Sequence, residues 1–209
     1  TISTGNDGTA IGFEALKANT TGNSNTGIGC SALTTNTTGG YSVAVGYNAL
    51  GANTTGGGNV AVGWKALEAN TTASDNTAVG RQALYANTTG TYNTAVGRSA
   101  LISNTTAQYN TAFGRQALYA ATTGGSNIAF GPNALVSVVT GSFNLAIGRN
   151  ALAANTASDN IAIGNDAGDA LTTGTKNIGI GVSSLSTSST ASGNTAIGWH
   201  ALKLLTTAT

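Results

Sequence analysis

One pattern of apolar and polar positions repeats twelve times along the chain, and each copy is built around a glycine. The glycines, from Gly12 to Gly198, are 17 residues apart, except for one interval of 16 between Gly148 and Gly164. The copy over residues 93–109 reads NTAVGRSALISNTTAQY. We count positions from the residue four before the glycine, which is position 5. Self-similarity at a fixed period predicts a stack of identical supersecondary units.

Positions 2 to 4 of each copy predict a short β-strand that ends at the glycine. Side chains alternate along a strand, so positions 2 and 4 share a largely β-branched face, whereas positions 3 and 5 share a face of Ala and Gly only. Neither face is reliably polar, and we therefore expect both to be buried or closely approached by another backbone. A short helix over residues 81–87 is the alternative, which the frequent β-branched residues and the short period disfavour.

These features predict an all-β, parallel β-solenoid of twelve coils of about 17 residues. We expect one repeat domain over residues 1–209, as a piece of a longer fibrous protein. Stacking at about 4.8 Å per strand gives a rod of roughly 55–60 Å with ladders of Val or Ile, Leu, Asn and Thr. We expect one Val or Ile, one Leu and some alanines in each interior. So thin a core favours self-association, which we expect at the Ala/Gly face.

Composition excludes several classes of function. Charged residues make up 7% of the chain and the net charge is +1, against about 25% charged residues in ordinary domains. The chain therefore lacks the basic footprint of a nucleic-acid-binding protein. No apolar run reaches the ~18 residues of a membrane span. Cys30 is the only cysteine, so an intrachain disulfide is excluded. No phosphate-binding loop motif occurs, and we expect no cofactor.

The motif Asn-Thr-Ala-Val-Gly, two variable residues and then Ala-Leu resembles the head repeats of trimeric autotransporter adhesins of the YadA type. It is more similar still to repeats of bacteriophage tail-fibre proteins, and the resemblance extends from about Thr9 to Leu202. It implies a left-handed parallel β-roll with three chains around one axis, displayed on a cell or virion surface for attachment. The 17-residue period and the Asn-Thr-Thr-Gly segment depart from the adhesin repeat.

Positions 6 and 7, just after the glycine, vary most and are the candidate binding columns. Aromatic rings beside amides and guanidinium groups suit carbohydrate recognition. The alternative is that these side chains are only the exposed edge of a rod. Like charges at Arg81, Arg98 and Arg115 would recur in neighbouring coils, so a ligand or a partner chain should supply acceptors. The candidate receptor or glycan contacts are Tyr47, Trp64, Arg81, Gln82, Arg98, Arg115, Gln116, Arg149 and Trp199.

Three other features have a structural and a functional interpretation. Asn165, Asp166 and Asp169 in the tenth copy predict an irregular loop, with an oxygen-ligand calcium site as the alternative. His200 has no catalytic partners nearby in sequence and is expected to be a surface residue. The six Asn-Thr-Thr sequons are expected to be turns, with glycosylation as the alternative; they begin at Asn19, Asn36, Asn53, Asn70, Asn87 and Asn104.

The leading hypothesis is a non-enzymatic, extracellular attachment module that assembles with itself, as a homotrimer or higher assembly, and binds a cell-surface glycan or protein receptor. We expect no catalytic or metal site, no nucleic acid and no membrane insertion. A second hypothesis is a purely structural filament or sheath subunit. A third is an ice-binding solenoid, but adjacent Thr residues in an extended segment point to opposite faces rather than forming one flat array.

Overall fold

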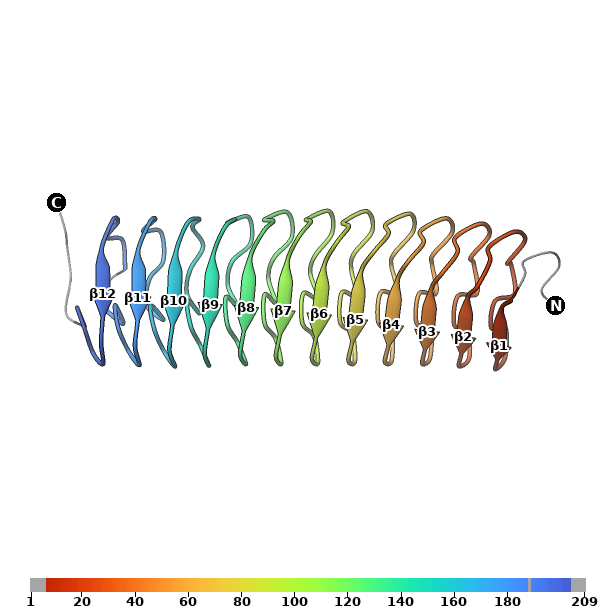
Figure 1. Cartoon of the computed structure of the whole chain (residues 1–209), viewed down its shortest axis with the longest axis horizontal. Helices are drawn as coiled ribbons and strands as arrows, with labels where there is room; N and C mark the ends of the chain where they lie inside the picture. Colours follow the sequence, from red (N-terminus) through yellow and green to blue (C-terminus); the bar gives the residue numbers. More distant parts are fainter. Residues whose placement is uncertain (1–6, 188, 204–209) are drawn as a thin grey trace.

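The computed structural model of the chain describes residues 7–187 and 189–203, which form one parallel β-solenoid without helices (Figure 1). Each copy of the repeat makes one coil and contributes one three-residue strand, in sequence order, to a single sheet. The first strand and the last strand lie at opposite ends of the rod. The strands are β1 (Thr9–Ile11), β2 (Thr26–Ile28), β3 (Val43–Val45), β4 (Val60–Val62), β5 (Thr77–Val79), β6 (Thr94–Val96), β7 (Thr111–Phe113), β8 (Ile128–Phe130), β9 (Leu145–Ile147), β10 (Ile161–Ile163), β11 (Ile178–Ile180) and β12 (Thr195–Ile197).

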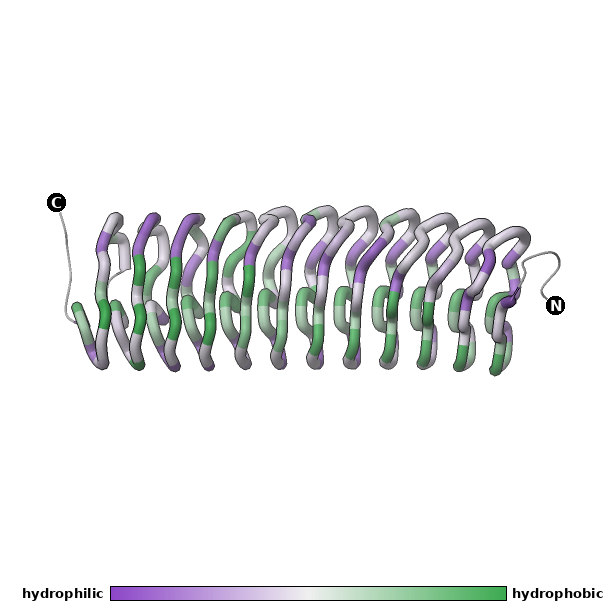
Figure 2. The backbone as a smooth tube through the Cα atoms, in the orientation of Figure 1, coloured by the Kyte–Doolittle hydropathy of each residue, from purple (hydrophilic) through white to green (hydrophobic). Residues whose placement is uncertain are grey.

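Neighbouring strands pair in register, so the predicted ladders of identical residues are confirmed. Ala78 of β5 lies beside Ala95 of β6, and Val79 beside Val96. Register also holds across the 16-residue interval, where Leu145 of β9 pairs with Ile161 of β10. The residue missing there belongs to the Asn-Thr-Thr-Gly turn, so the turn absorbs the deletion. In Figure 2, hydropathy accordingly varies around each coil more than along the rod.

The interior of each coil is narrow and is filled by positions 3, 8 and 9. Ala78, Ala83 and Leu84 of one coil are all fully buried. The strand face of Ala and Gly therefore points inward, against the leucine column, and is not the free face that we expected partner chains to approach. The β-branched face points outward: Val79 is half-buried, and Phe113 is 43% exposed. The prediction that a Val or Ile fills the interior was therefore wrong.

Glycine at position 5 is required both by its backbone conformation and by its neighbour. Gly97 has φ 132°, a region that residues with a side chain rarely adopt. A Cβ atom added to it would lie 2.6 Å from the carbonyl carbon of Gly114 in the next coil. The glycine column therefore lets successive coils approach closely at the bend after each strand.

A six-residue turn follows each glycine, in place of the short helix considered for residues 81–87. Within each coil three residues that are usually not glycine adopt left-handed backbone conformations, as do Gln82 (φ 58°), Leu84 (φ 51°) and Tyr92 (φ 59°). They occupy positions 7, 9 and 17. The turns are bonded along the rod: the Leu84 amide donates to the Ala100 carbonyl at 3.0 Å.

Two ladders of buried asparagine side chains run along the rod, as the repeat predicts. At position 1, Asn76 Oδ1 accepts a hydrogen bond from the Asn93 amide at 2.9 Å, and Asn93 Nδ2 donates to the Ala107 carbonyl at 2.8 Å. At position 12, Asn87 Nδ2 donates to Asn70 Oδ1 in the preceding coil at 3.0 Å. Buried polar groups must be hydrogen-bonded. These ladders meet that requirement and join neighbouring coils.

Candidate binding surface

Position 6 forms one exposed column along the rod, because the chain leaves the strand at the glycine bend and turns this side chain into solvent. All four arginines and both tryptophans of the chain occupy this position. Every side chain in the column is exposed. We call it the position-6 column; it consists of Phe13, Cys30, Tyr47, Trp64, Arg81, Arg98, Arg115, Pro132, Arg149, Asn165, Val182 and Trp199.

The structure brings three of the predicted contacts together as consecutive members of this column. Arg81, Arg98 and Arg115 follow the paired strands β5, β6 and β7. In the part of the chain that the structure describes, no carboxylate forms a salt bridge with any of the three. The reason is visible in the sequence, because residues 76–158 contain no Asp or Glu. Two unit charges about 5 Å apart in water repel by about 0.8 kcal/mol before salt screening, so the triplet carries a real electrostatic cost.

Aromatic and charged side chains cluster at the N-terminal side of the triplet. The Arg81 guanidinium carbon lies 5.0 Å from the centre of the Trp64 ring, and Lys65 Nζ lies 5.1 Å from it. Lys65 is paired with Glu68 at 3.1 Å, and this hydrogen bond raises the pKa of the Lys65 ammonium. Tyr47 precedes Trp64 in the same column and is 50% exposed. Tyr47 therefore offers an aromatic surface in the same column, two coils before Arg81.

Position 7 contributes less than expected. Gln82 and Gln116 are half-buried, and both have the left-handed conformation that the turn requires. At the C-terminal end, the rings of Trp199 and His200 stack with centroids 4.0 Å apart. His200 is half-buried rather than an exposed surface residue.

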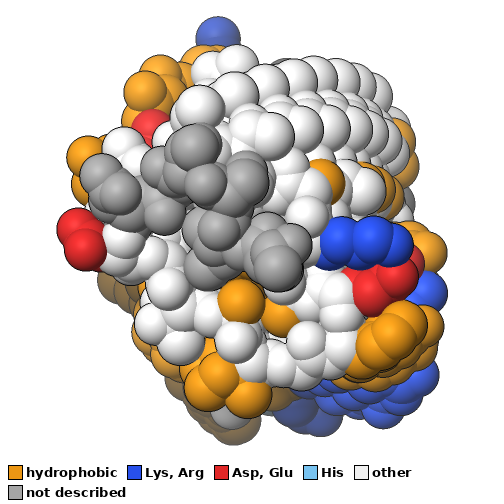
Figure 3. Space-filling view, turned by 90° about the vertical axis from the view of Figure 1, so that its right-hand side faces the viewer, with side chains coloured by type: hydrophobic (Ala, Val, Ile, Leu, Met, Phe, Trp, Pro, Cys, Tyr) orange, Lys and Arg blue, Asp and Glu red, His pale blue; other side chains and the backbone are white. Residues whose placement is uncertain are grey.

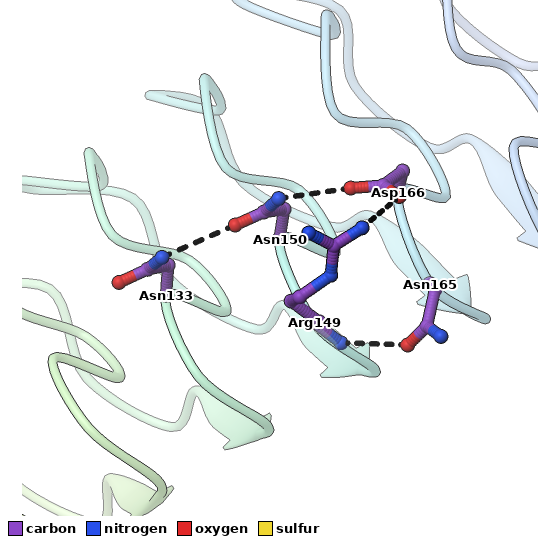
Figure 4. A network of polar contacts seen from close by, with 5 residues as sticks. All are labelled: Asn133, Arg149, Asn150, Asn165 and Asp166. Atoms are coloured by element: carbon purple, nitrogen blue, oxygen red, sulfur yellow. Dashed lines mark hydrogen bonds and ion pairs between the residues drawn. The ribbon is translucent and has the colours of Figure 1, made fainter.

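Arg149 differs from the other arginines because it has an acidic partner (Figure 4). Its Nη2 atom lies 2.9 Å from Asp166 Oδ2 in the next coil. Asp166 Oδ1 accepts a hydrogen bond from Asn150 Nδ2, also at 2.9 Å, and Asn150 Oδ1 accepts one from Asn133. Both carboxylate oxygens of Asp166 thus already accept from side chains of the preceding coil, which leaves little of them for a cation.

The tenth copy is a regular coil, so the predicted irregular loop was wrong. Gly168 replaces the usual leucine and keeps its left-handed conformation, with φ 59°. Leu171, three residues later, occupies position 12, where most copies have asparagine, and is fully buried. Burial and the charge of Asp166 raise the pKa of the Asp169 carboxyl. Within the described residues, no three His, Cys, Asp or Glu side chains come together to form a metal site.

The sequon asparagines belong to the position-12 ladder. Asn36, Asn53, Asn70, Asn87 and Asn104 are fully buried, and Asn19 is 3% exposed. In Asn70, the Nδ2 atom that would carry a glycan donates to Asn53 Oδ1 and to the Ala73 carbonyl. A glycan on this atom is incompatible with the folded coil. The structural interpretation of these six sites therefore fits the structure.

The two threonine columns have different environments. At position 13, Thr88 is half-buried and its hydroxyl donates to the Thr105 carbonyl of the next coil. At position 14, Thr89 and its counterparts are exposed. The exposed array is therefore one threonine wide, in agreement with the expected divergence of adjacent Thr side chains.

Sequence reasoning overlooked the aromatic stacks that the register creates. The rings of Phe113 and Phe130 stack in parallel on the outward sheet face, with their centroids 4.7 Å apart. Tyr92 and Tyr109 stack at 5.2 Å at position 17. Aromatic residues 17 apart in the sequence are the signal that would have predicted both pairs.

No pocket opens in the described ranges, 7–187 and 189–203. Nor does that part of the chain contain a helix long and apolar enough to cross a membrane. Recognition by this rod would therefore use its side columns rather than a cleft. Compared with models of protein families, with curated proteins and with solved structures, the chain matches none of them, so its function has to be inferred from its own residues.

Proposed function

We propose that the chain is a non-enzymatic, extracellular attachment module that assembles into a trimeric fibre and binds a cell-surface receptor or glycan. The supporting observation is that some positions of each coil build its interior and others are left on its surface. Positions 1, 3, 5, 8, 9 and 12 hold the coil together, whereas the outward strand face and the position-6 column lie outside this buried interior. The first of these surfaces suits assembly and the second suits recognition.

Assembly through the outward strand face follows from its uniformity. Position 4 is apolar in all twelve coils, from Ile11 to Ile197. A partner that covers such a face along the rod must repeat with the same period, and another copy of this chain does so by definition. Three copies around one axis form a closed assembly in which the outward strand face of each chain is covered by its neighbours. The left-handed β-roll and the virion or cell-surface location implied by the resemblance belong to the same proposal.

Sedimentation equilibrium tests the assembly. We expect a mass of three chains for the natural sequence and of one chain for the double variant Val79→Lys, Val96→Lys, because lysines opposite one another on a covered face repel. The matched control is Thr89→Lys, Thr106→Lys, which changes exposed position-14 residues of the same coils and should remain trimeric. A natural chain that is monomeric at micromolar concentration would refute the proposal.

A structural filament is the second candidate. In the described residues every strand pairs only with its neighbours in sequence, in one continuous sheet of identical coils. Further chains stacked along the same axis would continue this pairing, as in a filament. Negative-stain images separate the two functions: discrete rods support the attachment module, and open-ended polymers support the filament.

A further inference from the structure

We propose that the surface made by Tyr47, Trp64, Arg81, Arg98 and Arg115 binds an anionic polysaccharide, with the arginines contacting its carboxylate or sulfate groups. This inference rests on the proposed attachment function and specifies the chemistry of its ligand. We call these five residues the aromatic–arginine segment of the position-6 column.

The charge distribution is the first argument. The net charge of the chain is +1, yet residues 76–148 contain three arginines and no acidic residue. All three arginines stand in adjacent coils of one exposed column, where each adds to the repulsion felt by the others. In Figure 3, which looks along the rod from its N-terminal end, basic side chains gather along a lower edge beside apolar ones. A ligand with regularly spaced negative charges would relieve this repulsion.

The contrast with Arg149 is the second argument. This arginine occupies the same position but is neutralised within the chain by Asp166. The fold can therefore place a carboxylate against a position-6 arginine in the next coil. Asp166 is at position 7 of that coil, and the corresponding residues after Arg81, Arg98 and Arg115 are the uncharged Ser99, Gln116 and Asn133. The guanidinium groups of the triplet remain available, and charge-assisted, bidentate hydrogen bonds to carboxylate or sulfate are the strongest that they form.

The shape and chemistry of the column favour a polysaccharide. Neighbouring coils advance by about 4.8 Å, comparable to one pyranose ring of an extended chain. Tyr47 presents a half-exposed ring in the same line, two coils before Arg81, and aromatic rings stack on the apolar faces of sugars. A nucleic acid is the less suitable occupant, because three exposed charges give a small electrostatic footprint.

Binding measurements with immobilised polymers test the inference on the full chain. The probes are heparin and polygalacturonate as acidic polysaccharides, dextran as a neutral one and single-stranded poly(dT) as a nucleic acid. We expect heparin or polygalacturonate to bind, with affinity that falls as salt rises because the charges are exposed. Arg98→Gln should weaken binding about five-fold, and the triple variant of Arg81, Arg98 and Arg115 to Gln about a hundred-fold.

Arg149→Gln is the matched control, and we expect it to change affinity less than two-fold. Replacing all three arginines of the triplet by lysine should retain part of the affinity, because the positive charges remain. Circular dichroism and sedimentation check that every variant keeps its fold and its assembly state. The inference is overturned if Arg149→Gln weakens binding as much as Arg98→Gln, if Arg98→Gln dissociates the assembly, or if poly(dT) binds more tightly than the acidic polysaccharides. Binding of dextran alone would refute the anionic ligand and leave the attachment function standing. If the chain binds none of these polysaccharides and also fails to bind cells that carry its receptor, both the polysaccharide inference and the proposed attachment function are refuted.

Discussion

The position-12 asparagine ladder makes a quantitative prediction, because its interior and its end differ. Asn70 lies inside the ladder: its Nδ2 donates to Asn53 Oδ1 at 2.8 Å and to the Ala73 carbonyl at 3.0 Å, and its Oδ1 accepts from Asn87 Nδ2 at 3.0 Å. Asn70→Ala removes three hydrogen bonds of about 1 kcal/mol each. It also leaves Asn53 Oδ1 buried without a donor, which costs about 1–3 kcal/mol more. We expect the free energy of unfolding to fall by about 4–6 kcal/mol.

Asn104 ends the ladder, because the next coil has Ala121 at position 12. Its Nδ2 donates to Asn87 Oδ1 at 2.7 Å and to the Ala107 carbonyl at 3.3 Å, but its buried Oδ1 has no partner. Asn104→Ala removes two hydrogen bonds and moves the unpaired acceptor to Asn87, so the number of unpaired acceptors stays the same. We therefore expect a loss of about 2 kcal/mol.

The assay is urea unfolding followed by circular dichroism, at one protein concentration for both variants. Both substitutions remove the same atoms from fully buried sites, so their cavity costs are similar and the difference isolates the hydrogen bonds. Asn70→Ala should unfold with a free energy about 2–4 kcal/mol lower than that of Asn104→Ala. Equal losses, or a larger loss for Asn104→Ala, would refute the inference that the ladder stabilises the stack.

Two further predictions concern the glycine column and the tenth coil. Gly97→Ala should lower the free energy of unfolding by at least about 3 kcal/mol, because the added Cβ would lie 2.6 Å from the backbone of Gly114. The Cβ of Gly198→Ala would meet nothing within 4 Å, so this variant should lose only about 1–3 kcal/mol through backbone strain. Thermal unfolding compares the two variants, and equal losses would contradict the close approach of successive coils at the glycine column. The pKa of the Asp169 carboxyl is raised above its ordinary value of 3.8, so the folded state binds the carboxyl proton more tightly than the unfolded state does. The stability of the folded state therefore falls as the pH rises from 3.8 through the raised pKa. Asp169→Asn should therefore be more stable than the natural chain at pH 7 and no more stable well below pH 3.8, and a stability difference that does not change with pH would refute this assignment.

Much of the fold follows from the repeat, but the inside of the sheet does not. The period predicts coils, in-register ladders and asparagine columns, and these are confirmed by the pairing of Ala78 with Ala95 and by the Asn70–Asn87 bond. A small residue at position 3 can be required for two physical reasons: the backbone of a partner chain approaches the outside of the strand, or the interior of the coil is narrow. The second applies, because the position-9 leucine lies against position 3: a Cβ atom added to Gly27 would be 3.3 Å from Leu16 Cγ.

The left-handed residues were predictable from an absence that we overlooked. In a chain rich in Thr, Val and Ile, positions 7, 9 and 17 never carry a β-branched residue. Such residues are the ones that a positive φ excludes most strongly. Of the candidate site, the position-6 column was identified from its variability. The pairing of Arg149 with Asp166 was not, because that contact joins different positions of neighbouring coils.

The most direct test of the central claim, that the outward strand face joins copies of the chain, is cross-linking at single introduced cysteines. In a Cys30→Ser background, Val96→Cys places the thiol on this face, and Thr106→Cys places it in the exposed position-14 column of the same coil. With a short bis-maleimide linker at micromolar protein, we expect Val96→Cys to give covalently joined chains and Thr106→Cys to remain a single chain. Joined chains from Thr106→Cys with none from Val96→Cys would contradict the account.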